Sequence, residues 1–457
     1  MQSRVLPLLV IGLGAALQPL DTSVNVAFPA ITAAFDLKLQ SIQWIAIAYV
    51  LTYATMVLVC GRLGDLFGYR LIFRLGLLIS TVALILCALA ETYPMLLAFR
   101  VLQGIGTALV MSCAPALTVA LYPESERTRA LSFYGMLYAA GIAGGPLIGG
   151  FAIEALGWQG VYWFRVPIAL AALCASFVLA PGTRAALDRF DFSSALLLGF
   201  WMSTILLGLA LLQAPGIPAG IALGLLGAGT LVLALFIRRE RHSPNPTIRL
   251  SLFASARFSA INLLNIAIFL VGFAALLLVP YYLTRILALE VRAVGLVMTL
   301  WAAGSMLGAW AAGKLAVKSV SQHLLAFCYG WILCLGLALA ALCGLDTGLM
   351  LIGAALLLQG IALGGFQVAY TDMVVAALRV EERGVAGSLA MLTRTLGTVG
   401  GATVLAAAYA ILEAGALGAG YGPQPAFVIA FVYVFAGSAA VLAMLLLATM
   451  LVFRTAR

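Results

Sequence analysis

The stretch Gln18–Asn25, with the sequence QPLDTSVN, lies inside an otherwise apolar run that covers residues 5–28. A run of this length can cross a bilayer, because an α-helix needs about 20 residues to span the hydrocarbon core. A carboxylate inside such a span is costly unless it faces protein or water, so Asp21 is a candidate functional residue. Pro19 lacks a backbone donor and leaves the carbonyl of Ala15 without its helical partner, which predicts a local irregularity beside Asp21.

Two polar side chains share a helical face with Asp21. Asn25 follows it by four residues and Gln18 precedes it by three, which are the spacings of neighbours on an α-helix. We therefore expect both to contact substrate. The alternative explanation is that Asp21 ends the helix among the lipid headgroups, but the chain continues apolar over residues 26–28.

The composition of the 457-residue chain excludes a soluble protein, because 64% of its residues are hydrophobic and only 9% are charged. The first run has no A-x-A-like cleavage site, so we expect it to be retained as a span. The net charge of +9 comes from Lys and Arg scattered between apolar runs, which is the pattern of topology signals and not of a nucleic-acid partner. The seven cysteines form no C-x-x-C pair and the two histidines are far apart, so we expect no disulfide framework, metal site or cofactor.

Apolar runs separated by short loops predict an all-α integral membrane protein with fourteen transmembrane helices and no soluble domain. The approximate spans are residues 5–28, 43–61, 71–90, 94–121, 130–153, 160–180, 192–213, 218–237, 259–284, 293–313, 323–344, 348–377, 385–412 and 426–453. Of the 25 Lys and Arg residues, four lie on the side opposite the N-terminus (Lys38, Arg165, Arg285 and Arg292), two lie within spans, and the remaining 19 lie on the N-terminal side. This asymmetry places both termini in the cytoplasm.

An internal repeat occurs at an offset of about 256 residues. The sequence LQGI at residues 102–105 returns at residues 358–361, and Gly141, Gly144 and Gly145 return as Gly397, Gly400 and Gly401. Parallel repeats of this kind are a transporter architecture. They predict an N-terminal six-helix bundle (residues 1–183) and a C-terminal six-helix bundle (residues 258–457). Residues 184–257 have no counterpart, so we expect two inserted transmembrane helices with charged cytoplasmic linkers.

The decapeptide Gly61–Arg70, GRLGDLFGYR, lies between the second and third spans. Its glycines permit a tight turn or close helix approach, and its acid stands beside two arginines. It resembles the loop signature of the major facilitator superfamily. Four further stretches resemble motifs of the 14-helix drug:proton antiporter branch of that family: Leu20–Pro29, Gln43–Tyr49, Arg100–Gly106 and Gly141–Gly150.

This resemblance covers essentially the whole chain. It implies the major-facilitator fold, in which two pseudo-symmetric six-helix bundles here carry two inserted helices and both termini lie inside. It also implies a proton-coupled antiporter that exports lipophilic compounds such as drugs by alternating access. We accordingly expect a monomer in a bacterial cytoplasmic (inner) membrane, with a small lipophilic or amphipathic substrate, protons and the lipid bilayer as its partners. The conformational gate would comprise Gly61, Asp65, Gly68, Arg70, Gly141, Gly145 and Pro146.

The sequence also departs from the pattern of that branch. Arg165 stands where the branch usually has Asn, Val317 replaces Asp65 in the second copy of the loop motif, and the loop over residues 413–425 is short. These departures concern the substrate class more than the fold.

Two pairs of charged residues are candidates for proton coupling. At about 1.5 Å per residue, Asp21 and Arg100 both lie roughly 8–9 Å below the outer membrane boundary, so we hypothesise that they are coupled. Desolvation and a nearby guanidinium have opposite effects on the protonation of a carboxylate, so their balance can be tuned. Asp372 and Arg394 lie within reach by depth and form the second pair. The alternative explanation for either pair is a structural ion pair.

Polar and aromatic side chains inside the spans predict an amphipathic cavity. The candidate substrate-binding residues, besides the two that flank Asp21, are Tyr49, Tyr53, Gln103, Tyr134, Tyr138, Asn262, Asn265 and Gln359. A membrane-embedded amide or phenol needs a partner, so each of them could instead serve as an interhelical contact.

The chain has no Walker motif and no convincing nucleophile–base pair, which argues against an ATP-driven pump and against an enzyme. Two other functions stay open. One is an importer or facilitator of a metabolite or organic anion, in which Arg100, Arg165 and Arg394 would bind a carboxylate. The other is a membrane receptor that transports nothing.

Overall fold

The computed structural model describes residues 2–120, 127–179, 192–211, 218–242, 250–317, 320–377 and 383–455, and the regular elements in these ranges are helices. Twelve helices in this part of the chain are long and apolar enough to cross a membrane. Two more, α3 (Leu39–Phe67) and α9 (Phe192–Leu211), contain shorter apolar stretches. The all-α membrane fold is therefore confirmed, while the count of fourteen spans and the cytoplasmic termini stay predictions.

The chain divides into two compact units. The first comprises residues 1–37, 44–207 and 223–247, and the second comprises residues 38–43, 208–222 and 248–457. Most of the predicted insertion belongs to the first unit: a Cβ on Gly199 of α9 would lie 3.1 Å from the Thr55 carbonyl of α3, and one on Gly229 of α10 (Ala219–His242) would lie 2.7 Å from Ile205 of α9. Most of α9 and α10 thus lies in the first unit, and the three-part domain organisation stays a prediction.

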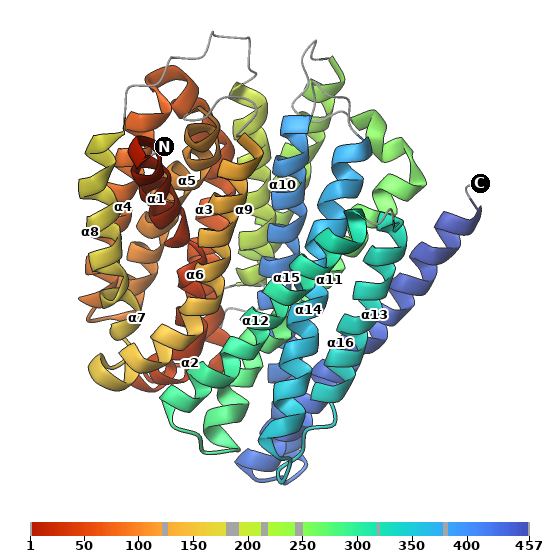
Figure 1. Ribbon diagram of the computed structural model, residues 1–457. Coiled ribbons are helices and arrows are strands. Elements are labelled where there is room, and N and C mark those ends of the chain that lie inside the picture. Colours follow the sequence, from red (N-terminus) through yellow and green to blue (C-terminus); the bar gives the residue numbers. More distant parts are fainter. Residues whose placement is uncertain are drawn as a thin grey trace. The chain divides into compact units, whose positions relative to one another are not determined.

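In the first unit, the first span consists of three pieces: α1 (Gln2–Ala16), the 3-10 turn η1 (Pro19–Thr22) and α2 (Ser23–Ala34). The helices that follow α3 are α4 (Tyr69–Ala88), α5 (Tyr93–Ala120), α6 (Arg127–Leu156), α7 (Gly160–Trp163), α8 (Arg165–Ala175) and the 3-10 turn η3 (Ser176–Val178). The α1 helix packs against α5 and α8, and α4 packs against the same two helices (Figure 1). This arrangement brings the broken first span beside α5 and α8.

The second unit repeats the helix pairing of the first. Its elements are η4 (Leu250–Ala254), α11 (Ala256–Arg285), α12 (Val291–Val317), α13 (Gln322–Ala340), α14 (Leu349–Ala377), α15 (Arg383–Gly418) and α16 (Pro423–Thr455). The α13–α14 pair corresponds to α4–α5, and α11–α15 corresponds to the packing of α1 and α2 on α6. Gly104 lies against the Tyr49 carbonyl of α3, and its repeat partner Gly360 lies against the Trp301 carbonyl of α12. The repeat in the sequence is thus a repeat of close helix crossings.

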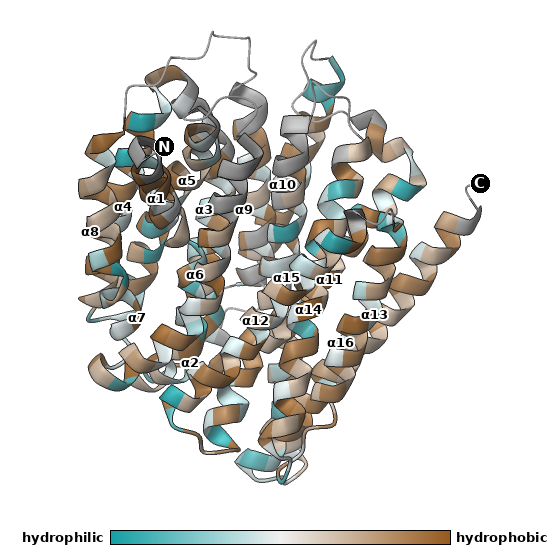
Figure 2. Ribbon diagram, in the orientation of Figure 1, coloured by the Kyte–Doolittle hydropathy of each residue, from teal (hydrophilic) through white to brown (hydrophobic). Residues whose placement is uncertain are grey.

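Apolar side chains cover the outward faces of both units. Phe177 of η3 is 68% exposed, and Met444 and Leu451 of α16 are 62% and 60% exposed. Figure 2 shows the apolar colouring along α13 and α16. Exposed apolar surface on this scale suits hydrocarbon as the solvent.

The decapeptide Gly61–Arg70 is not the loop that the sequence predicted. The α3 helix continues to Phe67 and α4 begins at Tyr69, so Gly68 alone joins them. Gly68 has a φ of +94°, which favours glycine because it has no Cβ. A Cβ on Gly64 would lie 2.6 Å from the Tyr69 ring, so this glycine permits the sharp reversal. The side chain of Asp65 lies outside the described part of the structure.

Two arginines of α4 hold the end of the α8–η3 segment. Arg70 donates a hydrogen bond to the carbonyl of Leu179 at 2.8 Å, and Arg74 donates one to the carbonyl of Ser176 at 2.8 Å. Basic side chains commonly satisfy the last carbonyls of a helix in this way. Arg70 therefore has a structural contact inside the first unit, and its role in a gate stays a prediction.

The crossing of α4 and α5 gives a test of the packing. A Cβ on Gly76 would lie 2.8 Å from both the Leu109 Cβ and the Val110 backbone nitrogen. Gly76→Ala should therefore overpack the crossing, destabilise the protein by about 1–3 kcal/mol and lower its unfolding temperature in detergent.

The matched control is Gly227→Ala on α10, where an added Cβ meets nothing within 4 Å. It should keep or slightly raise the unfolding temperature, because alanine favours the helix by about 0.8–1.0 kcal/mol over glycine. Equal unfolding temperatures for the two variants would contradict the packing described here.

Candidate functional site

The first span is broken beside Asp21, as Pro19 predicted. The α1 helix ends at Ala16 and α2 begins at Ser23, with η1 between them. The carbonyl of Ala15 is not free: it accepts a hydrogen bond from the backbone N–H of Gln18 at 3.3 Å. The break is therefore a tightened turn, a geometry that places functional groups without exposing backbone to lipid.

Glycines of α6 form the surface on which the turn lies. A Cβ on Gly141 would lie 2.7 Å from Pro19 Cγ, and a Cβ on Gly145 would collide with the hydroxyl of Thr22. These glycines are four residues apart and share one helical face. The close approach of η1 to α6 thus requires glycine at these positions. Pro146 lies inside the same helix.

Two arginines bind Asp21. Arg100 of α5 donates from Nη1 to Oδ1 at 2.6 Å and from Nη2 to Oδ2 at 2.8 Å, which is a bidentate ion pair. Arg165, the first residue of α8, donates from Nη1 to Oδ1 at 2.6 Å. The carboxylate therefore connects three segments of the first unit, namely η1, α5 and α8.

Neighbouring groups fix the orientation of Arg100. Its Nε donates to the carbonyl of Ile45 at 3.0 Å, and its Nη1 also contacts Oε1 of Gln103 at 2.8 Å. The guanidinium lies over the ring of Tyr49, 4.3 Å from its centroid, in a cation–π contact. Gln103 in turn donates to Oδ1 of Asp21 at 3.2 Å. Both Gln103 and Tyr49, predicted as substrate ligands, thus contact the charged cluster.

The cluster is buried and unequally charged. The exposed fractions of the side chains are 1% for Arg100, 0% for Arg165 and 11% for Asp21. Charges taken out of water are tolerated when they are paired and hydrogen-bonded, and removal of one partner leaves the other uncompensated. Asp21 is therefore the group on which the burial of both arginines depends.

The position of Arg165 corrects the sequence analysis, which placed it on the outer side of the membrane. Its Nε donates to the carbonyl of Val161 at 2.7 Å, and its side chain is completely buried. The short helix α7 and α8 together form the span predicted over residues 160–180, so Arg165 lies inside that span. A single basic residue within an apolar run was the feature of the sequence that could have predicted the burial of Arg165.

Other predicted ligands of the first unit make separate contacts. Tyr138 of α6 donates to Oε1 of Gln18 at 2.5 Å. The rings of Tyr53 and Tyr49 stack with centroids 6.4 Å apart. Asn25 and Tyr134 are half-buried. The hydrogen bond between Gln18 and Tyr138 thus joins the start of η1 to α6, the helix that contains Gly141 and Gly145.

The second unit contains a neutral polar network. Tyr370 donates to Oδ1 of Asn262 at 2.8 Å and lies 3.1 Å from the hydroxyl of Thr393, which accepts from Nδ2 of Asn265 at 2.7 Å. The two asparagines were predicted from the sequence as substrate ligands, whereas their partners Tyr370 and Thr393 were not. Gln359 is separate from them and donates to the carbonyl of Gly336 at 3.2 Å.

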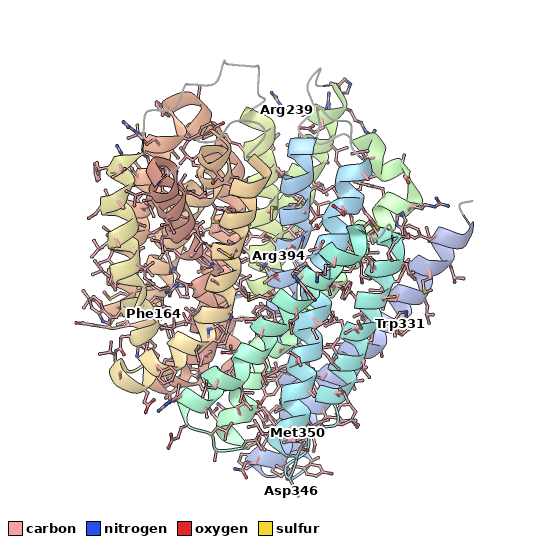
Figure 3. All side chains as sticks on the ribbon, in the orientation of Figure 1. Phe164, Arg239, Trp331, Asp346, Met350 and Arg394 are labelled. Carbon is pink, nitrogen blue, oxygen red and sulfur yellow. The ribbon has the colours of Figure 1, made fainter. Side chains whose placement is uncertain are left out.

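The expected second ion pair is not formed. Asp372 and Arg394 are both exposed, and within the described part of the chain they make no ion pair with each other. Arg394 instead lies over the ring of Phe269, 5.1 Å from its centroid, part-way along α15 (Figure 3). Similar depth therefore did not bring these two charges together.

No described group of three or more His, Cys, Asp or Glu side chains could hold a metal ion. The cysteines are free thiols.

Comparisons with known proteins give one family. The sequence profile of the Major Facilitator Superfamily matches residues 11–402. The tetracenomycin C resistance and export protein of Streptomyces glaucescens is 30% identical over 408 residues, which cover 87% of this chain and 74% of that protein. The riboflavin transporter RibZ of Clostridioides difficile is 27% identical over 402 residues, which cover 87% of this chain and 86% of that protein. A solved bacterial homologue of the human lysosomal transporter Spinster has a TM-score of 0.66 at 17% identity and covers 99% of this chain and 96% of its own.

The dependence of both arginines on Asp21 can be tested by stability. Asp21→Asn leaves two buried guanidiniums without a carboxylate, so we expect a loss of about 3–5 kcal/mol and a clearly lower unfolding temperature in detergent. Glu154→Gln is the control. Because Glu154 of α6 is exposed, this substitution should change the free energy of unfolding by less than about 0.5 kcal/mol. Similar unfolding temperatures for both variants would show that the cluster is not held by Asp21.

Proposed function

The chain belongs to the Major Facilitator Superfamily, and from that premise we propose that it is a proton-coupled antiporter that exports small lipophilic compounds. It is a multi-pass membrane protein of a transporter family and not an enzyme. The proposal adds three points to that identity: the direction of transport, the proton as driving ion and the class of substrate.

Similarity to export proteins supports the direction and the substrate class. The tetracenomycin C resistance and export protein matches 87% of this chain, and the multidrug resistance protein Stp of Mycobacterium tuberculosis matches 88% at 28% identity. The motif Gly141–Gly150, which resembles the antiporter motif, provides the glycine face beneath the broken span. The resemblance of this motif and the glycine face of α6 also support the proposal that Gly141, Gly145 and Pro146 belong to the conformational gate.

The observation that carries proton coupling is the ion pairing of Asp21 with Arg100 and Arg165. A proton on Asp21 would neutralise the carboxylate that both guanidiniums bind. Because the arginines lie on different helices, loss of this charge would weaken the link between η1, α5 and α8 together. Proton binding to Asp21 would then shift the equilibrium between helix arrangements, and the helix arrangement would in turn change the affinity of Asp21 for the proton. Coupling requires this reciprocal dependence.

The turn η1 is the element that can move when Asp21 binds or releases a proton. Asp21 lies on η1, between two helices that end and begin within the span, so it can shift without sliding a whole helix. Gln18, which receives a hydrogen bond from Tyr138, lies at the start of this turn. We assign to Gln18, Tyr138 and the stacked Tyr49 and Tyr53 the role of sensing substrate beside the proton site.

A second function deserves a test because of one specific similarity. The riboflavin transporter RibZ matches 87% of this chain, so relatives of this length also carry a metabolite. On this alternative the protein is a facilitator or importer of a metabolite or organic anion, and the two buried arginines serve its binding.

Reconstitution in liposomes separates the two functions. With an imposed pH gradient and a dye that reports lumenal pH, we expect proton movement that depends on substrate, tested with a lipophilic cation, a neutral drug, riboflavin and an organic anion. Asp21→Asn should abolish the proton movement because it cannot bind and release a proton in the same range, whereas Asp21→Glu should retain part of it.

The control is Glu154→Gln, which should move protons at the wild-type rate. Equilibration of a compound without dependence on the pH gradient would instead establish the facilitator. Proton coupling that persists in Asp21→Asn would remove Asp21 from the mechanism.

A further inference from the structure

The charge of the Asp21 cluster is not balanced. Arg100 and Arg165 contribute two positive charges, and Asp21 contributes one negative charge. Among the side chains that the structure describes, Asp21 is the only carboxylate in ion-pair contact with either arginine. A net positive charge inside a membrane-spanning bundle is strongly unfavourable unless an anion offsets it.

Among the side chains of the first unit that the structure describes, the other acids do not provide the missing charge. Asp36, Glu91 and Glu154 are exposed, Glu240 is buried in α10, and none of the four forms an ion pair with Arg100 or Arg165. The counter-charge must therefore come from outside the described side chains.

Two buried donors, one on Arg165 and one on Tyr162, have no acceptor among the described residues. Arg165 uses Nε on the Val161 carbonyl and Nη1 on Asp21, but its Nη2 is buried without a hydrogen-bond partner. The hydroxyl of Tyr162 is also buried without a partner. Arg165 lies over the ring that carries this hydroxyl, with its Cζ 5.3 Å from the centroid of Tyr162. Buried donors in folded proteins are nearly always paired, so both need an acceptor.

We propose that Arg165 and Tyr162 form a binding site for one monovalent anion, either a small inorganic anion such as chloride or the carboxylate of a transported compound. A neutral acceptor would satisfy the two donors but would leave the excess charge, so the charge argument and the hydrogen-bond argument together select an anion. The Nη2 of Arg165 can donate a charge-assisted hydrogen bond to either kind of anion. The carboxylate as source rests on the proposed transport function, whereas chloride does not.

An anion at this site would account for the presence of an arginine at position 165. Arg165 follows Phe164 (Figure 3) at the start of α8, and Asp21 already has a bidentate partner in Arg100. Arg165 thus adds a charge that the cluster does not need for its own pairing. Residues that cost stability in this way are commonly retained for binding.

The test measures thermal unfolding of the purified full-length protein in detergent, with no pH gradient. The buffer contains a bulky anion, and sodium chloride, sodium acetate or sodium benzoate is titrated at constant ionic strength. For the wild-type protein we expect a saturable rise of about 5 °C with at least one of these anions, because ligands that bind the folded state stabilise it.

Two variants make the test specific. Arg165→Gln keeps the Asp21–Arg100 pair and removes the excess charge, so its unfolding temperature without the anion should equal or exceed that of the wild type and should not respond to the anion. Tyr162→Phe removes only a hydroxyl donor, so the anion concentration at half-saturation should rise about tenfold. If Arg165→Gln does not fold, the proposal is still tested by the wild-type titration and by the change in the half-saturating anion concentration of Tyr162→Phe.

The responding anion identifies the source. A response to chloride assigns an inorganic anion, and a response to acetate or benzoate alone assigns the carboxylate of a transported compound. The absence of a wild-type response, or equal responses from the wild type and Arg165→Gln, would overturn the proposal. Because no transport is measured, its failure would leave proton coupling untouched, and failure of proton coupling would leave the anion site testable.

Discussion

The contact between one carboxylate and two guanidiniums organises the first unit. Asp21 binds Arg100 in a bidentate pair and Arg165 through one oxygen, and both arginines are almost completely buried. In a membrane such charges are tolerated only when they are paired, so the positions of η1, α5 and α8 are constrained together. Any change in the charge of Asp21 therefore acts on three segments at once.

The backbone around this contact is adapted to it. Pro19 interrupts the first span, and the α6 glycines give room for the resulting turn. The turn carries Asp21 toward α5, while Tyr138 of α6 binds Gln18 at its start. A continuous helix, packed against residues larger than glycine on α6, could not place the carboxylate in the same way. Pro19 and the α6 glycines therefore together determine the position of Asp21.

The two units share a helix pairing but not a chemistry. Gly104 and Gly360 mark equivalent close crossings, whereas the charged cluster of the first unit has a neutral network of Asn262, Asn265 and their partners in the second. A duplicated architecture has thus kept its packing residues in both copies, while the ion pairs that the structure describes lie in the first.

The sequence by itself determined the membrane class, the family resemblance, the repeat and the irregular span, because apolar length, glycine spacing and proline act locally. It also indicated the Asp21–Arg100 pair, since depth along a helix follows from a fixed rise per residue. Only the tertiary structure decided which charges meet. It brought Arg165 to Asp21 and left Asp372 apart from Arg394, because the rotation of a helix about its axis depends on its neighbours and not on its own sequence.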